Sequence, residues 1–147
     1  MIERYTRDAM GSVWTPQAKM DAWLRVELAA TDAWSAEGVV PPEAAAACRE
    51  RAAFTVEAVN ERERITNHDV AAFIDVVAES VGDHGRWIHY GLTSSDVLDT
   101  ALATQLAAAG EILVDGARAY RDALVARAFD YRDTLCVGRT HGVHAEP

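Results

Sequence analysis

One long stretch decides the fold: residues 93–133, which read TSSDVLDTALATQLAAAGEILVDGARAYRDALVARAFDYRD. The stretch contains no proline, and its apolar residues recur in steps of four and three, which is the spacing of one helix face. The residues of this apolar row are Leu98, Leu102, Leu106, Ala109, Leu113, Ala117, Tyr120 and Leu124. A repeat of about 11 residues predicts a helix that is nearly straight or slightly right-handed in its supercoil.

This helix is too long for a small compact domain. About forty residues span about 60 Å, whereas a compact chain of this length has a radius of gyration of about 15 Å. The apolar row must therefore be covered by other helices, which predicts a bundle completed by further sequence, by other copies of the chain, or by both. The last segment, Leu135–Pro147, has no closing element, so we expect the sequence to be part of a larger protein.

The rest of the chain also predicts helices. Alanine is abundant and the alternation typical of strands is nearly absent, which indicates an all-α fold. Thr15 and Pro16 suit the start of a helix that ends near Gly38. Further helices are predicted over residues 42–54, 55–64 and 67–80. We expect an N-terminal domain of short helices, residues 1–92, followed over residues 93–147 by the first long helix of a bundle domain.

The composition narrows the possible partners. The chain has 14 Lys and Arg against 23 Asp and Glu, and the net charge of −9 argues against nucleic acid. All but one of the cations are arginine, which suits oxyanion contacts, although base composition also explains the bias. No apolar run approaches the roughly 20 residues of a membrane span, and the first residues lack a signal-peptide pattern. Because Cys48 and Cys136 fit no disulfide framework, the sequence predicts a cytoplasmic protein.

The first candidate site is the turn Thr93-Ser94-Ser95 at the start of the long helix. A helix N-terminus offers unpaired N–H groups and a partial positive charge, and three hydroxyls add donors. This combination favours binding of a carboxylate or phosphate. With Asp96, the same residues also match a capping box, so simple helix capping is the alternative.

The second candidate is the segment Gly138–His144, which reads GRTHGVH. Glycines near His141 let a ligand approach the backbone closely, and an imidazole, whose ordinary pKa is about 6.5, suits a general acid. Cys136, His141 and His144 form a weaker metal-site pattern, because no second cluster of ligands accompanies them. A solvated loop with incidental histidines also fits the pattern.

Asn67, His68 and Asp69 form a third candidate at the start of a predicted helix. Asn67 or Asp69 suits the N-cap, and a carboxylate or backbone carbonyl nearby suits the orientation of His68. Adjacent residues on a helix do not face each other, so a direct pair between His68 and Asp69 is not expected.

Two more segments carry polar side chains. Arg4 beside Tyr5 suits a phosphate group, although chain termini commonly fray. The loop over residues 83–92 contains His84 and His89, and the simpler interpretation is a loop packed by its aromatic residues.

Four segments together resemble a known family. They read IERYTRDAMGSVW, TNHDVAAFID, IHYGLTSSDVLDTAL and GRTHGVHAEP, in that order along the chain. They resemble adenylosuccinate lyase, a family of the fumarase/aspartase superfamily. The resemblance implies a lyase that needs no cofactor or metal, releases fumarate from adenylosuccinate to leave AMP, and makes the same cut on the succinyl-carboxamide ribotide of purine biosynthesis. It further implies a homotetramer built on a bundle of long helices, with active sites shared between subunits.

The resemblance also assigns roles to single residues. Arg4 and Tyr5 match a pair near the nucleotide phosphate, while Thr93 and Ser94 match hydroxyls that hold the succinyl portion. His141 matches the general acid, and Thr140 matches a neighbouring substrate contact. The remaining substrate-binding positions are Asn67, His68, Asp69 and His89. Asn67 departs from the family pattern, in which Lys or Arg is common, and the role of His89 is not specified.

One part of the family's machinery is missing from these residues. Its general base is a serine on a Gly-Ser-Ser-x-Met-Pro-x-Lys-x-Asn loop, and no such segment occurs in the chain. We therefore expect negligible lyase activity from the 147 residues alone. The alternatives are a 3-carboxymuconate cycloisomerase-like member of the superfamily, a non-catalytic helical oligomerisation module, and a zinc-binding module.

Overall fold

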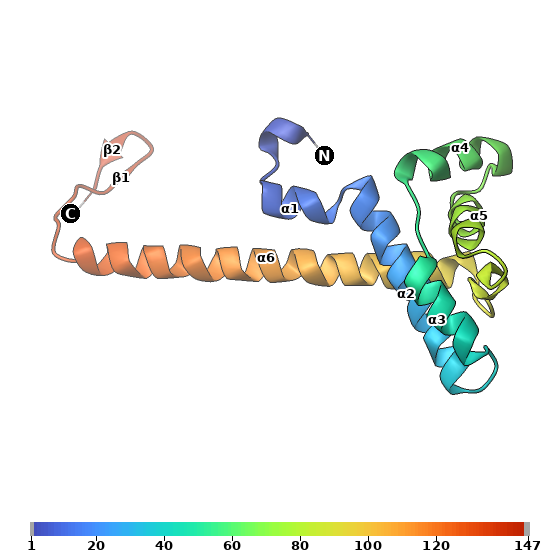
Figure 1. The fold of residues 1–147 in the computed structure, drawn as a ribbon. Helices are drawn as coiled ribbons and strands as arrows, with labels where there is room; N and C mark the ends of the chain where they lie inside the picture. The colour runs from blue at the N-terminus through green and yellow to red at the C-terminus, as the bar shows by residue number, and fades with distance from the viewer. Residues whose placement is uncertain (1, 146–147) are drawn as a thin grey trace. The chain divides into compact units, whose positions relative to one another are not determined.

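The computed structural model describes residues 2–145, and its residues fall into two compact units, 1–110 and 111–147. Figure 1 shows that helices dominate the fold, which confirms the all-α prediction. The two units meet inside one long helix, and the predicted domain boundary after Leu92 stays a prediction.

The described residues of the first unit form two short 3₁₀ helices, five α-helices and the first turns of a sixth. In chain order they are η1 (Glu3–Tyr5), α1 (Asp8–Val13), α2 (Pro16–Ala36), α3 (Pro42–Arg51), α4 (Val56–Thr66), α5 (Asp69–Val81), η2 (Gly85–Trp87) and α6 (Ser94–Asp130). The second unit contains the rest of α6 and a hairpin of two short strands, β1 (Arg139–Thr140) and β2 (Val143–His144).

Local chemistry explains where α2 begins. The Thr15 side chain accepts a hydrogen bond from the Ala18 N–H at 3.0 Å, and Pro16 occupies the first helical position, as predicted. The next helix, α3, ends at Arg51 and not at Phe54 as the sequence predicted. A distant contact explains the difference, because the Ala53 N–H donates to the Ser80 hydroxyl at 2.9 Å and leaves the helical path.

An aromatic cluster forms the centre of the first unit. The Trp23 ring of α2 meets Phe73 of α5 edge-on, with ring centroids 5.4 Å apart, and Phe54 contacts Phe73 at 5.3 Å. Val97 and Ala101 of α6 belong to the same core and are fully buried. The first turns of α6 are therefore anchored in the core of this unit.

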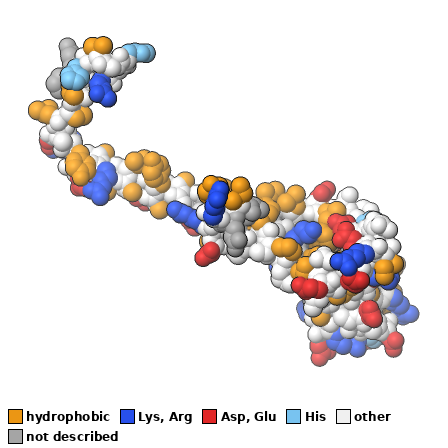
Figure 2. Space-filling view, turned by 90° about the horizontal axis from the view of Figure 1, so that it is seen from above, with side chains coloured by type: hydrophobic (Ala, Val, Ile, Leu, Met, Phe, Trp, Pro, Cys, Tyr) orange, Lys and Arg blue, Asp and Glu red, His pale blue; other side chains and the backbone are white. Residues whose placement is uncertain are grey.

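The face that α6 buries shares only Ala109 with the predicted row. The buried residues recur every fourth position and are Val97, Ala101, Gln105 and Ala109. Gln105 is accommodated because its amide donates to the Val13 carbonyl at 2.6 Å. The predicted row, in contrast, has exposed leucines: Leu102, Leu106, Leu113 and Leu124 expose from 46% to 65% of their area. Figure 2 shows such hydrophobic side chains at intervals along the helix.

Charged and polar residues interrupt α6, so it contains no unbroken apolar run of the length of a membrane span, as the sequence indicated. By length and composition alone, Ser94–Asp130 passes the test for a helix that spans a membrane, with a mean hydropathy of 1.4 over one 18-residue window. Alanine and leucine give the helix this hydropathy, and the core helix of a bundle has the same composition. Composition therefore does not distinguish the two environments.

Candidate functional site

The turn at the start of α6 leaves its hydroxyl groups free. The Thr93 N–H donates to Asp96 Oδ2 at 2.8 Å, which is one half of the predicted capping box. Within residues 2–145, the hydroxyls of Thr93, Ser94 and Ser95 have no hydrogen-bond partner. Because Asp96 supports the backbone, the three hydroxyls remain available to a ligand at the positive end of α6.

His89 lies close before this turn and is held by a buried acid. Its Nδ1 is 2.7 Å from Oε1 of Glu27, a residue of α2 whose side chain is completely buried. Desolvation raises the pKa of the Glu27 carboxyl, and the hydrogen bond and charge of His89 partly oppose this rise. Sequence reasoning missed Glu27, although an acidic residue in line with Met20, Trp23 and Thr31 on the buried face of α2 was an available signal.

Aromatic packing fixes the loop that carries His89. His89 has a φ of 66° and Gly91 a φ of 72°, so two nearby residues adopt left-handed conformations. A Cβ atom at Gly91 would lie 2.9 Å from the Trp34 ring, which requires glycine there. Tyr90 contacts both Trp34 and Trp87 edge-on, with centroids 5.8 Å and 5.2 Å apart. The loop is therefore a packed segment, as its aromatic residues predicted.

The segment Asn67–Asp69 connects α4 to α5, and its capping differs from the prediction. Asn67, with a φ of 50°, ends α4 in the left-handed conformation. The N-cap of α5 is His68, whose Nδ1 accepts from the Ala71 N–H at 3.3 Å, so neither Asn67 nor Asp69 has that role. Since Nδ1 accepts, the neutral His68 ring carries its hydrogen on Nε2. Asp69 instead accepts from the Val70 N–H at 2.7 Å, and its distance of 3.6 Å from the ring of His68 is too long for a hydrogen bond.

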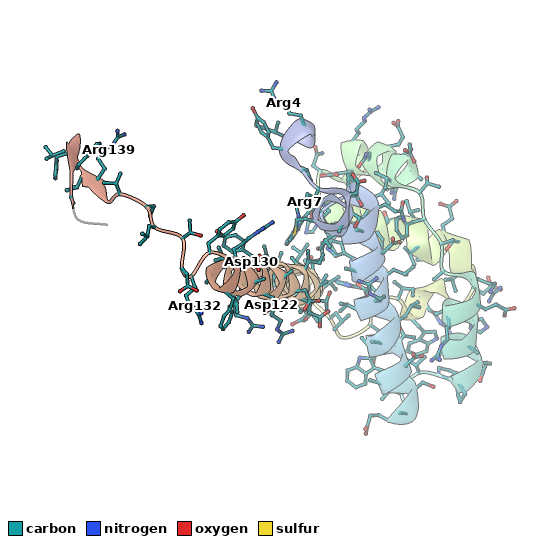
Figure 3. All side chains as sticks on the ribbon, turned by 90° about the vertical axis from the view of Figure 1, so that its left-hand side faces the viewer. Arg4, Arg7, Asp122, Asp130, Arg132 and Arg139 are labelled. Carbon is teal, nitrogen blue, oxygen red and sulfur yellow. The ribbon has the colours of Figure 1, made fainter. Side chains whose placement is uncertain are left out.

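Arg4 and Tyr5 contact each other on the short turn η1. The Arg4 guanidinium lies 4.8 Å from the centroid of the Tyr5 ring, and both residues are exposed. The Thr6 hydroxyl donates to the Ile2 carbonyl at 2.8 Å and closes the turn. Figure 3 shows the Arg4 side chain extending away from the ribbon, so its charge faces solvent.

In the second unit, His141 lies at the tip of the β1–β2 hairpin, where the sequence predicted only a loop. Thr140 pairs with Val143, which leaves His141 and Gly142 as a two-residue turn with φ angles of 49° and 76°. Positive φ at both positions is typical of the type I′ turn, the common connection of a tight hairpin. The His141 side chain is exposed, and the Ala145 N–H donates to the Gly138 carbonyl at 2.7 Å below the tip.

The structure brings only some of the predicted residues together. His89, Thr93 and Ser94 lie on one continuous segment of the first unit, whereas Thr140 and His141 belong to the second. Among residues 2–145, no three His, Cys, Asp or Glu side chains form a metal-binding group, and Cys136 is exposed. Within the first unit, the pair of His89 and its buried partner Glu27 is therefore followed, a few residues further along the chain, by the hydroxyls at the start of α6.

Comparison with known proteins gives one consistent family. A family model described as lyase matches residues 3–147. The adenylosuccinate lyases of Bacillus subtilis and Staphylococcus saprophyticus are 46% and 48% identical to the chain over all 147 residues. The crystal structure of a fumarate lyase from Mesorhizobium sp. BNC1 matches 96% of the chain with a TM-score of 0.88 and 26% identity. The chain spans only 34% of the length of each of these proteins.

Because the family model covers nearly the whole chain, the chain belongs to the lyase family.

Proposed function

We propose that the complete protein is an adenylosuccinate lyase, to which this chain contributes its N-terminal portion. It releases fumarate from adenylosuccinate to give AMP, and makes the same cut on the succinyl-carboxamide ribotide of purine biosynthesis. The observation that carries this proposal is the 46–48% identity to two adenylosuccinate lyases across every residue of the chain. Because the match to adenylosuccinate lyases covers the whole chain, it favours this activity over that of a cycloisomerase of the same superfamily and over a non-catalytic module.

The elimination requires stabilisation of negative charge. A proton leaves the carbon next to a carboxylate, the C–N bond breaks, and the departing nitrogen takes up a proton. Negative charge grows on the carboxylate as the C–H bond breaks. The free hydroxyls of Thr93 and Ser94, together with the N-terminus of α6, support a role in binding that carboxylate more strongly in the transition state than in the ground state.

His141 is proposed as the general acid for the departing nitrogen. Its exposed position at a tight hairpin tip supports this role, because a two-residue turn presents the imidazole on a defined backbone. Thr140 is the adjacent substrate contact. The general base lies outside these 147 residues, since they contain no Gly-Ser-Ser segment.

The remaining contacts are assigned to the nucleotide. The exposed Arg4 guanidinium beside the Tyr5 hydroxyl supports binding of the phosphate. Asn67, His68 and Asp69 form the second binding segment, in which Nε2 of His68 has no hydrogen-bond partner among residues 2–145 and can donate. We propose no cofactor or metal for the reaction.

We further propose that the complete protein is a cytoplasmic homotetramer. The exposed leucines of α6 support assembly, because a row of exposed apolar side chains on one helix commonly marks an interface. The resemblance to the adenylosuccinate lyase family supports active sites that are shared between subunits. A net charge of −9 argues against nucleic acid as a partner, and we propose no membrane association.

Product analysis with the complete polypeptide tests the proposed function. We expect AMP and fumarate to appear in equal amounts from adenylosuccinate, and no reaction with 3-carboxymuconate. Lactone formation from 3-carboxymuconate with no cleavage of adenylosuccinate would instead establish the cycloisomerase. Inactivity towards both substrates in a correctly assembled protein would favour the oligomerisation module.

A further inference from the structure

The contact between Glu27 and His89 is the most unusual polar contact of the first unit. Glu27 is 0% exposed, and its Oε2 atom has no hydrogen-bond partner within the described residues. Its Oε1 atom lies 2.7 Å from Nδ1 of His89, whose side chain remains 22% exposed. His89 is the one titratable group that acts on Glu27 in the described part of the chain.

The cost of burying charge restricts where the protons of this pair lie. If Glu27 were a carboxylate and His89 a neutral imidazole with its hydrogen on Nδ1, Nε2 would carry no hydrogen. The pair would then hold a buried net negative charge with one carboxylate oxygen unpaired, which is strongly unfavourable. Two neutral arrangements avoid this cost. In one, a carboxylate faces an imidazolium, and in the other, a protonated carboxyl donates to Nδ1. The imidazole carries a hydrogen on Nε2 in both arrangements.

The orientation of the ring directs that hydrogen away from Glu27. Nδ1 is engaged by the carboxyl group, while Nε2 has no partner within residues 2–145. The backbone of His89 is held at a φ of 66° by a loop packed against Trp34, so the ring is fixed at both its backbone and its Nδ1. The hydroxyls of Thr93 and Ser94, which the proposed function assigns to an anion, follow on the same segment.

We propose that Glu27 is a positioning residue, which holds His89 through Nδ1 so that its Nε2–H donates to an anionic group of the substrate, a carboxylate or a phosphate. This inference rests on the proposed function, because it concerns how the substrate of that reaction is held. Neither the composition of α2 nor the sequence motifs assign such a role to Glu27.

A double-mutant cycle in the complete enzyme tests the inference. Glu27→Met has a similar shape but cannot bond to Nδ1, and we expect kcat/KM to fall about tenfold. Glu27→Gln retains the tether, because its amide N–H can donate to Nδ1, and we expect most of the activity to remain. In His89→Gln, the new side-chain amide supplies a fixed donor near the position of Nε2. In this background, Glu27→Met should lower kcat/KM by less than about twofold.

Several results would overturn the inference. If Glu27→Met lowers kcat/KM equally in both backgrounds, Glu27 acts only on the fold. The same conclusion holds if a loss of thermal stability accounts for the whole fall in kcat/KM. An equal loss in Glu27→Gln and Glu27→Met excludes the tether. Asp21→Asn, which changes a partly exposed acid of the same helix bonded to Gln17, is the matched control and should leave kcat/KM unchanged.

Inhibitors distinguish the two possible anions. Succinate and inorganic phosphate serve as probes of the carboxylate and phosphate positions, and the probe whose inhibition weakens in Glu27→Met identifies the anion that His89 contacts. Unchanged inhibition by both probes overturns the inference.

A spectroscopic measurement separates this inference from the proposed function. In protein labelled with ¹⁵N-histidine, the His89 resonances are identified by their loss in His89→Gln. Under the conditions of the activity assay, we expect Nε2 of His89 to carry a hydrogen. A bare Nε2 in the wild-type protein overturns the inference whether or not the protein cleaves adenylosuccinate, whereas a protonated Nε2 in a protein without lyase activity contradicts only the proposed function.

Discussion

His141 is the first residue of a two-residue turn at positive φ, and this backbone decides which substitution tests it best. Asparagine adopts the left-handed conformation readily, so His141→Asn keeps the hairpin while it removes the imidazole. In the complete polypeptide, we expect turnover to fall by about 10²-fold or more, with assembly unchanged. Turnover is measured by fumarate release and assembly by light scattering.

His144 supplies the control for this prediction. It lies on the neighbouring strand β2, where it pairs with Arg139, and it has no proposed role in catalysis. His144→Gln should reduce turnover only slightly. If both substitutions reduce turnover equally, the integrity of the hairpin explains the loss, and the assignment of the acid is wrong.

Glu27 makes the stability of the first unit depend on pH. Its pKa in the folded protein is raised above the ordinary value of 4.5, so the folded state holds the proton more tightly than the unfolded chain. The stability linked to this group is therefore fully present below pH 4.5 and is lost as the pH rises through the raised pKa. The glutamine side chain in Glu27→Gln does not titrate, so this variant does not lose stability over that pH range.

We therefore expect Glu27→Gln to gain free energy of unfolding relative to the wild type as the pH is raised from about 5 to about 8. Urea denaturation at both pH values measures the difference. A relative stability that falls with pH would show that Glu27 is stabilised as an anion in the folded protein.

Individual residues show which contacts the sequence predicts and which it does not. The cap at Thr15 depends on its immediate neighbours, and the sequence predicted it correctly. Glu27 and His89 are separated by 62 residues, so no local pattern joins them. The His68 cap was missed because histidine is an uncommon N-cap, and the strands beside His141 were missed because they are two residues long.

At the scale of the element, Gly85 controls how η2 packs against α5. A Cβ atom at Gly85 would lie 2.1 Å from the Ala78 carbonyl oxygen, which is backbone and cannot rotate away. We expect Gly85→Ala to destabilise the 147-residue chain by about 1–3 kcal/mol in urea denaturation. The loop that leads to His89 begins at this contact, so the effect extends to the candidate site.

Gly110 is the matched control for this prediction. A Cβ atom there meets nothing within 4 Å, and the residue lies inside α6. Gly110→Ala should stabilise the chain by about 0.5–1 kcal/mol, since alanine favours a helix. Equal destabilisation by both substitutions would contradict the packing of η2 described above.

Long-range contacts also explain which helix boundaries the sequence misplaced. The start of α6 at Ser94 agrees with the predicted capping box, because that signal is local. The end of α3 at Arg51 depends on Ser80, which lies in a different helix. The buried row of α6 was also missed, because Ala101 and Gln105 do not stand out as apolar residues. Ala101 becomes part of the core through the aromatic cluster of the first unit, and Gln105 is bonded to the Val13 carbonyl of α1.

At the scale of the whole molecule, the exposed leucines of α6 predict assembly. Leu113 and Leu124 are 65% and 52% exposed in this chain, and burial of each is worth about 1.5–3 kcal/mol. In the complete polypeptide, the double substitution Leu113→Asp with Leu124→Asp should weaken association by about 10²- to 10⁴-fold. Arg118→Asp also introduces an acid on this helix, but at a charged position, and should leave the assembly intact.

Sedimentation at several protein concentrations measures this association. If the double leucine variant assembles as the wild type does, the leucine row is not the interface. If the Arg118 variant dissociates to the same extent, added negative charge explains the result and apolar burial does not.

The most direct test of the proposed function is a side-by-side measurement of fumarate release from adenylosuccinate by the complete polypeptide and by the 147-residue chain. We expect steady release, with an equal amount of AMP, by the complete polypeptide and negligible release by the chain alone, which lacks the proposed base. Comparable release by the chain alone would contradict the division of the site, and no release by either would contradict the proposed function.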